Sequence, residues 1–236
     1  AGRELVFIST NAGVNLYLGT GRDFERKVAI RPGPEWKALG EEAARAGFAS
    51  PKAMSDYFTR KAWAQLRLDP GGAVQAYGKK LWLLIHGDEI ARNQAIYPFR
   101  AWSPLLAVLL WKYGIAFPYG ICWPLAVLGA ALALRQRVPR TWLPAAFVLA
   151  HLLVIAFFFV AARYRMNVVP FVVLFAVYGA AQLGARWRAG AWRQAAPLTL
   201  ALALLLVLSN WRVGAMARRF DADAYFNLGT RYLQEG

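Results

Sequence analysis

Two arginines flanking a single tyrosine are the residues of this chain best suited to bind a charged ligand. Arg163, Tyr164 and Arg165 form the segment ARYR between two long apolar stretches. Paired guanidiniums can hold a phosphate or diphosphate through bidentate hydrogen bonds, and Tyr164 can stack on a sugar. Alternatively, both arginines extend their charged ends to lipid headgroups and Tyr164 anchors at the membrane surface. The spacing alone leaves both interpretations open.

A second polar cluster precedes these residues. Glu89, Arg92 and Asn93 follow an apolar run, and we expect them on the end of a helix spanning Ala73 to about Arg92. Oppositely charged residues three apart on a helix can form an ion pair that stabilises it by about 0.2–0.5 kcal/mol. The alternative is polar contact with a sugar or a lipid phosphate. The spacing favours the intrahelical ion pair.

The two histidines do not have the spacing of metal ligands. His86 lies on the mostly apolar helix, and His151 lies within an apolar stretch. Neither has a second histidine or a cysteine at a ligand spacing, so we expect interior histidines and no metal site. The sequence also contains no glycine-rich phosphate loop, no GxSxG and no HExxH.

Four apolar stretches must position these polar residues. Hydrophobic residues make up 58% of the chain, and the mean hydropathy is +0.32. A helix needs about 17–25 apolar residues to cross a bilayer core. The sequence therefore predicts a mainly α-helical, polytopic membrane protein with about four transmembrane helices, near residues 115–134, 143–162, 166–183 and 197–213.

The net charge of +15 indicates anionic partners. The sequence contains no nucleic-acid-binding motif, so we expect membrane lipids or a phosphate-bearing substrate, and no nucleic acid. The loops after the first and third spans each hold three arginines, against two in the ARYR loop. The positive-inside rule then places the ARYR loop, the first hundred residues and the C-terminal tail on the outer side.

Local signals outside the spans predict short elements. Two β-rich runs, Leu5–Ser9 and Val14–Leu18, predict a hairpin. Helices are expected over Glu35–Arg45, after the capping Ser50 with Pro51 at the first helical position, and at the interface over Pro104–Leu110.

The ends of the chain suggest a fragment of a longer protein. The chain begins at Ala1 with no signal peptide, and its last residues show the spacing of a tetratricopeptide helix, with Tyr225, Leu228 and Tyr232 on one face. We expect an extracytoplasmic loop segment over 1–102, a transmembrane region over 103–213, and the start of a helical repeat over 214–236 that could bind protein partners.

An ordered set of motifs resembles a known family. STNAGVNLYLGTG at 9–21, the stretch 55–100 containing DPGG, KK and EIARN, SPLL at 103–106 and ARYR follow the order seen in bacterial GT-C glycosyltransferases related to dolichyl-phosphate-mannose protein mannosyltransferases. The chain departs from the family pattern at Ala12, where the family has Gly, and at Thr20, where it has Asn.

The resemblance implies a sugar transfer. Such proteins move a sugar from a polyprenyl-phosphate donor to a lipid, glycan or protein acceptor on the outer face of the bacterial inner membrane. By resemblance, Arg163 and Arg165 hold the donor phosphate, and Tyr164, Glu89, Arg92 and Asn93 line the cavity or contact the sugar. The family's catalytic acidic residue, and any divalent metal, would lie in a preceding half, so the catalytic residue is unknown and no cofactor is expected within this fragment.

Two other functions are compatible with parts of the sequence. Four spans carrying a tetratricopeptide array would suit a non-catalytic membrane scaffold. A transporter is disfavoured, because no acidic residue, lysine or arginine lies in the middle of an apolar stretch to form a pathway, and His151 is the one candidate.

Overall fold

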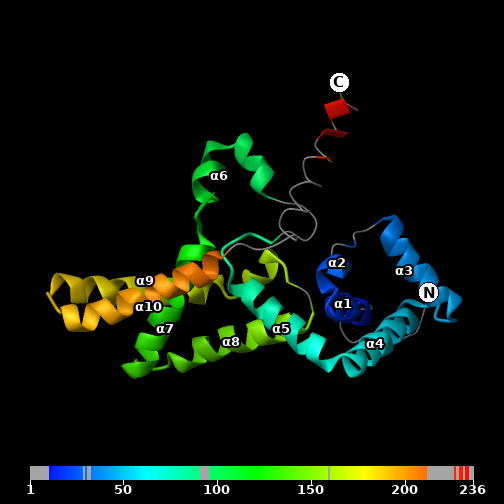
Figure 1. Ribbon diagram of the computed structural model, residues 1–236, viewed down its shortest axis with the longest axis horizontal. Coiled ribbons are helices and arrows are strands. Elements are labelled where there is room, and N and C mark those ends of the chain that lie inside the picture. Colours follow the sequence, from blue (N-terminus) through cyan, green and yellow to red (C-terminus); the bar gives the residue numbers. More distant parts are fainter. Residues whose placement is uncertain are drawn as a thin grey trace. The chain divides into compact units, whose positions relative to one another are not determined.

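The chain is mainly helical. A computed structural model describes residues 11–28, 30, 33–90, 96–158, 160–211, 226, 229–230 and 232–233 (Figure 1). These residues fall into two compact units: the first runs to residue 81 and includes 153–160, and the second holds 82–152 and 161 onward. The sequence-based boundary between 102 and 103 separates an expected loop segment from an expected membrane region, whereas these two units are divided by compactness. That boundary stays a prediction. The tetratricopeptide helix falls almost entirely outside the described residues.

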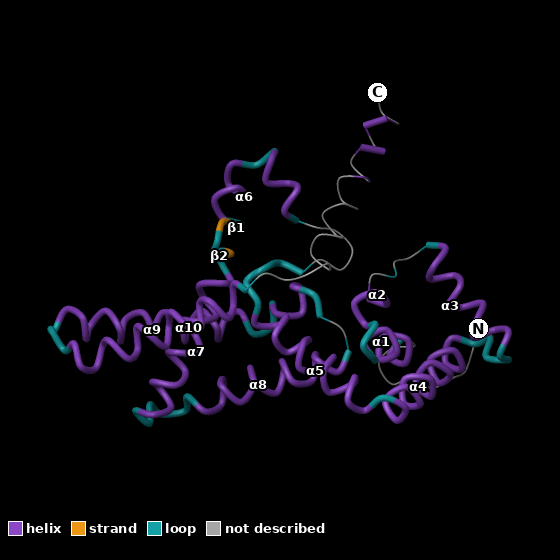
Figure 2. Tube along the Cα trace, in the orientation of Figure 1, coloured by secondary structure: helices purple, strands orange, loops and turns teal. Residues whose placement is uncertain are grey.

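The first unit is built from helices. They are α1 (Ala12–Gly19), α2 (Phe24–Val28), α3 (Pro34–Arg45), α4 (Pro51–Leu68) and most of α5 (Pro70–Ile85). Helix α1 packs along α4, as Figure 2 also shows, and the N–H of Gly13 donates to Ser55 Oγ over 3.0 Å. A side chain at Gly13 would collide with the Ser55 carbonyl, so this close approach requires glycine.

The predicted strand Val14–Leu18 is wrong, because these residues are helical. Val14 and Leu18 are both fully buried and lie four residues apart, the spacing of one face of a helix. Together with Leu39, Ala43 and Phe58 they form the core of this unit. The other strand of the predicted hairpin, Leu5–Ser9, lies outside the described residues.

The helix after Ser50 begins as predicted. Ser50 Oγ accepts a hydrogen bond from the N–H of Ala53 over 3.2 Å, and Pro51 occupies the first turn. Helix α3, expected over Glu35–Arg45, is also confirmed. Asp69 then caps α5 by accepting the N–H of Gly72 over 2.8 Å, so α5 starts three residues earlier than expected.

The predicted helix end at Arg92 is wrong for α5, which ends at Ile85. The following residues, His86–Ile90, are not helical. Glu89 therefore lies beyond the helix, and the expected intrahelical pair with Arg92 cannot form on α5. Arg92 and Asn93 lie outside the described residues.

The second unit contains the apolar helices. Its elements after α5 are a 3₁₀ helix η1 (Tyr97–Ala101), α6 (Pro104–Leu109), the antiparallel pair β1 (Lys112–Tyr113) and β2 (Ile115–Ala116), α7 (Tyr119–Arg135), the first part of α8 (Trp142–Phe157), the 3₁₀ helix η2 (Ala162–Arg165), α9 (Val169–Arg188) and α10 (Trp192–Asn210). Helix α6 confirms the short helix expected from Pro104.

Helices α7 and α9 approach most closely at a pair of glycines. A Cβ on Gly129 would lie 1.9 Å from the Phe175 carbonyl oxygen, and one on Gly179 would lie 2.5 Å from the Leu125 carbonyl oxygen. Backbone therefore packs directly on backbone at this crossing. Helix α10 packs against both α7 and α9.

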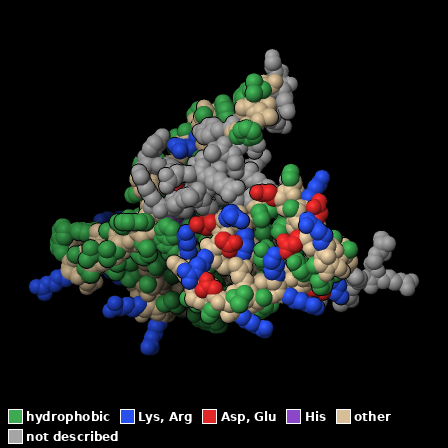
Figure 3. Space-filling model, turned by 45° about the vertical axis from the view of Figure 1, so that its right-hand side comes forward, with side chains coloured by type: hydrophobic (Ala, Val, Ile, Leu, Met, Phe, Trp, Pro, Cys, Tyr) green, Lys and Arg blue, Asp and Glu red, His purple; other side chains and the backbone are tan. Residues whose placement is uncertain are grey.

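Two described helices are long and apolar enough to cross a membrane, α9 and α10. The apolar helices α7 and α8 have 17 and 16 residues and are shorter. They are shorter than expected because residues 115–116 belong to the β-pair and α8 ends at Phe157, before the ARYR segment. Figure 3 shows hydrophobic side chains over the end of the unit that carries α9 and α10, where Leu174, Val177, Leu200 and Leu204 are exposed.

The last turn of α10 is attached by several hydrogen bonds, two of them made by the Asn210 side chain. Asn210 Oδ1 accepts the N–H of Ala116 over 2.7 Å, and Nδ2 donates to the carbonyl of Gly120 over 3.0 Å. Trp82 Nε1 also donates to the carbonyl of Leu208 over 3.2 Å. These contacts join α10 to the β-pair, to the start of α7 and to the end of α5.

Candidate functional site

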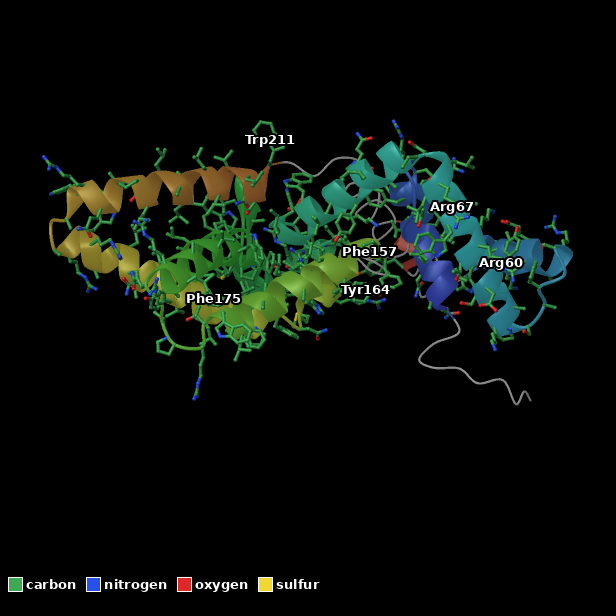
Figure 4. All side chains as sticks on the ribbon, turned by 90° about the horizontal axis from the view of Figure 1, so that it is seen from below. Arg60, Arg67, Phe157, Tyr164, Phe175 and Trp211 are labelled. Atoms are coloured by element: carbon green, nitrogen blue, oxygen red, sulfur yellow. The ribbon has the colours of Figure 1, made fainter. Side chains whose placement is uncertain are left out.

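The ARYR segment is the tight 3₁₀ turn η2 between α8 and α9. Arg163 is exposed, its guanidinium lies 5.0 Å from the ring centroid of Tyr164, and its Nη2 donates to the Tyr164 hydroxyl over 2.9 Å. The Tyr164 carbonyl accepts from His151 Nε2 over 2.9 Å, which joins the turn to α8 (Tyr164 is labelled in Figure 4). Arg163 and Tyr164 thus form a stacked, outward-facing pair.

Arg165 is buried, and only 2% of it is exposed. Its Nη1 donates to the His86 carbonyl over 2.5 Å, and its Nη2 donates to the Asp88 carbonyl over 2.6 Å. The guanidinium also lies 4.2 Å from the ring centroid of Tyr119 and 3.6 Å from a carboxylate oxygen of Glu89. Arg165 therefore binds the segment 86–90 to the turn through these hydrogen bonds and the ion pair.

The segment 86–90 is held by further hydrogen bonds. The Ile90 carbonyl accepts from Ala162 N over 2.9 Å, and the Tyr97 hydroxyl accepts from Glu89 N over 2.9 Å. Burial raises the pKa of Tyr97, so this phenol stays protonated at neutral pH. These contacts place the Glu89 carboxylate, which is about one-quarter exposed, beside the turn.

His86 fixes its own tautomer. Its Nδ1 accepts the N–H of Asp88 over 3.0 Å, and its Nε2 contacts the carbonyl oxygen of Trp211. Because a carbonyl only accepts, Nε2 carries the proton. His86 is thus an interior histidine with a bonding role, as the sequence suggests, whereas His151 is only partly buried. Among the described residues, no group of three or more His, Cys, Asp or Glu could hold a metal ion.

Of the predicted site residues, the structure brings Glu89 to Arg165, which lies in the same turn as Arg163 and Tyr164. It differs from the sequence-based expectation for Arg165, because both of its terminal nitrogens bond backbone carbonyls instead of facing outward. Phosphate binding by the pair stays a prediction. Sequence reasoning missed Tyr119 and Tyr97; the tyrosine following EIARNQAI was the available signal for Tyr97, whereas nothing local marked Tyr119.

The ARYR turn and the segment 86–90 together offer three kinds of contact. Arg163 supplies an exposed cation, Tyr164 supplies an aromatic face, and Glu89 supplies a carboxylate whose position is fixed by Arg165. A guanidinium suits a phosphate, whereas an aromatic face and a carboxylate suit a sugar and its hydroxyls.

Comparison of the chain with protein-family profiles, with curated proteins and with solved structures found no match.

Proposed function

We propose that this chain is part of a membrane glycosyltransferase that moves a sugar from a polyprenyl-phosphate donor to a lipid, glycan or protein acceptor. The observation that carries the proposal is the ARYR turn itself, which presents the exposed Arg163 beside Tyr164 and, through the buried Arg165, contacts the carboxylate of Glu89. The order of motifs shared with bacterial GT-C glycosyltransferases supports the same function.

The two arginines then contribute in different ways. Arg163 binds the donor phosphate directly and stabilises the negative charge that grows on it as the sugar leaves. Arg165 acts through the backbone, because it positions the segment 86–90 and the Glu89 carboxylate that contacts the sugar. The proton of the acceptor hydroxyl would pass to an acidic residue in the preceding half of the longer protein.

The membrane arrangement follows from the apolar helices. We propose that α7, α8, α9 and α10 all cross the bacterial inner membrane, with the ARYR turn on the outer side. At 1.5 Å per residue, α7 and α8 are about 25 Å long, which a locally thinned bilayer accommodates. The arginines that follow α7 and α9 would then lie in the cytoplasm.

The test is transfer of labelled sugar from a polyprenyl-phosphate donor by membranes that contain the intact protein. Arg163→Ala should reduce the rate of transfer by about 100-fold, as loss of one charge-stabilising donor does elsewhere. Arg67→Ala is the matched control, because Arg67 is an exposed arginine on α4 (Figure 4) and belongs to the first unit, whereas the ARYR turn belongs to the second; it should leave transfer unchanged.

Two results would count against the proposal. Equal transfer by the Arg163→Ala and Arg67→Ala variants would remove Arg163 from the site. No transfer by the wild-type protein from any polyprenyl-phosphate sugar would contradict the enzyme function and favour the membrane scaffold.

Accessibility labelling of a cysteine placed at Met166, which is exposed and directly follows the turn, should place the turn on the outer side of the membrane.

A further inference from the structure

Lys80, on α5 in the first unit, is a buried cation without a carboxylate partner among the described residues. Only 3% of it is exposed. Its Nζ donates to three backbone carbonyls, those of Gly19 over 2.9 Å, Phe158 over 3.2 Å and Phe157 over 3.4 Å. All of these residues belong to the first unit.

The carbonyls that surround Lys80 come from two helix ends. Helix α1 ends at Gly19 and α8 ends at Phe157, so the ammonium meets the negative ends of two helix dipoles. This partial charge does not replace a full counter-ion, and burial lowers the pKa of Lys80 to about 8. The positive charge is therefore only partly compensated.

Lys80 also lines an apolar cavity of about 320 Å³ within this unit. Apart from Lys80, the cavity is lined mainly by apolar and aromatic side chains, including Leu16, Trp63, Leu66, Val74 and Phe157. Trp63 and Val74 are 53% and 73% exposed, so they lie where the cavity meets its surroundings. At about 30 Å³ per water-sized group, the volume holds about ten methylene groups.

One wall of the cavity is braced. The rings of Tyr77 and Phe157 lie 4.9 Å apart, and the Tyr77 hydroxyl donates to the Leu153 carbonyl over 2.9 Å (Phe157 is labelled in Figure 4). Gly19 and Gly21 contribute further lining without side chains. The cavity is therefore a formed space with a mostly apolar lining and one buried cation.

We propose that this cavity binds a single-chain anionic amphiphile, a medium-chain fatty acid, with the chain against the apolar lining and the carboxylate beside Lys80. The carboxylate would replace the longest of the three carbonyl contacts, that of Phe157, and would supply the missing counter-charge. A neutral chain would gain only the apolar contacts, so the charge sets the specificity. None of the residues of the ARYR site takes part.

The experiment uses the intact protein in nanodiscs of zwitterionic lipid and a photoactivatable decanoic acid. Mass spectrometry of the cross-linked peptides should locate the label between residues 63 and 77, and unlabelled decanoic acid should compete with it. Lys80→Met should weaken binding at least tenfold. Lys79→Met is the matched control, because Lys79 is the neighbouring lysine, is half-exposed and pairs with Glu25 over 2.9 Å.

A second variant keeps the test decisive if Lys80→Met does not fold. Ala73→Trp retains Lys80 but fills the cavity, so it should abolish the competed label. Equal labelling of the wild type and both variants, labelling that unlabelled decanoic acid does not compete, or equal binding of decanol would overturn the proposal. Loss of labelling in these variants with unchanged sugar transfer would show that this site is independent of the proposed transferase function.

Discussion

The crossing of α7 and α9 predicts opposite effects for two glycine-to-alanine substitutions. In Gly129→Ala, the new Cβ would lie 1.9 Å from the Phe175 carbonyl oxygen and 2.8 Å from the Gly179 nitrogen. Carbon and oxygen pack at about 3.5 Å, so the two helices must separate locally by about 1.5 Å. Neither neighbour can rotate away, because both are backbone atoms.

The magnitude follows from this overlap. Forced overpacking in a close-packed interior costs about 1–3 kcal/mol, and we expect Gly129→Ala to lower the free energy of unfolding by that amount. Gly184, on α9, is the control, since a Cβ there meets no atom within 4 Å. Gly184→Ala should raise the free energy of unfolding by about 0.5–1 kcal/mol, the helix preference of alanine over glycine.

Both variants can be measured by unfolding in detergent micelles, followed by far-ultraviolet circular dichroism. A pair of spin labels on α7 and α9 would report the helix separation independently. If Gly129→Ala were as stable as Gly184→Ala, or if the spin-label distance did not change, direct backbone packing at this crossing would be refuted.

Two further predictions concern buried cations. Arg165→Met should lower the free energy of unfolding by about 3 kcal/mol, because two charge-assisted hydrogen bonds and the contact with Glu89 are lost, whereas Arg163→Met should lower it by less than about 0.5 kcal/mol. Amide hydrogen exchange over 86–90 should become faster only in Arg165→Met. Similar exchange in both variants would contradict the role of Arg165 in holding this segment. For Lys80, the pKa of about 8 in the folded protein lies below the ordinary lysine value of 10.5, so the unfolded chain binds more protons between these values and the free energy of unfolding should rise with pH across this window. The gain of wild type relative to Lys80→Met should reach about 3 kcal/mol by pH 10.5, and a pH-independent difference would exclude a buried charged lysine.

The helix ends that the sequence predicts correctly are those set by neighbouring residues. Ser50 and Pro51 start α4 through a local cap, and the same logic places α3 and α6. The strand over Val14–Leu18 failed because burial against α4 decides its structure. Helix α5 ends near Gly87, whose N–H donates to the Ser209 carbonyl over 2.7 Å, a partner far away in the chain.

The site shows the same division between local and distant information. The ARYR segment stands out in the sequence, and the structure confirms that it lies between two apolar helices. Which arginine is exposed depends on the segment 86–90, more than seventy residues earlier. Two chemically identical side chains two residues apart therefore have different environments, which no local pattern distinguishes.

Asn210 has a consequence for the placement of α10. Most of this helix is a run of leucine and alanine, so its surface presents similar side chains after a slip of one turn, about 5.4 Å. Such a slip would move the Asn210 amide by about 5.4 Å along the axis, out of reach of Ala116 and Gly120. The Asn210 amide, together with the hydrogen bonds of Trp82 and Gly87 to the same turn, thus gives an otherwise uniform helix one preferred alignment.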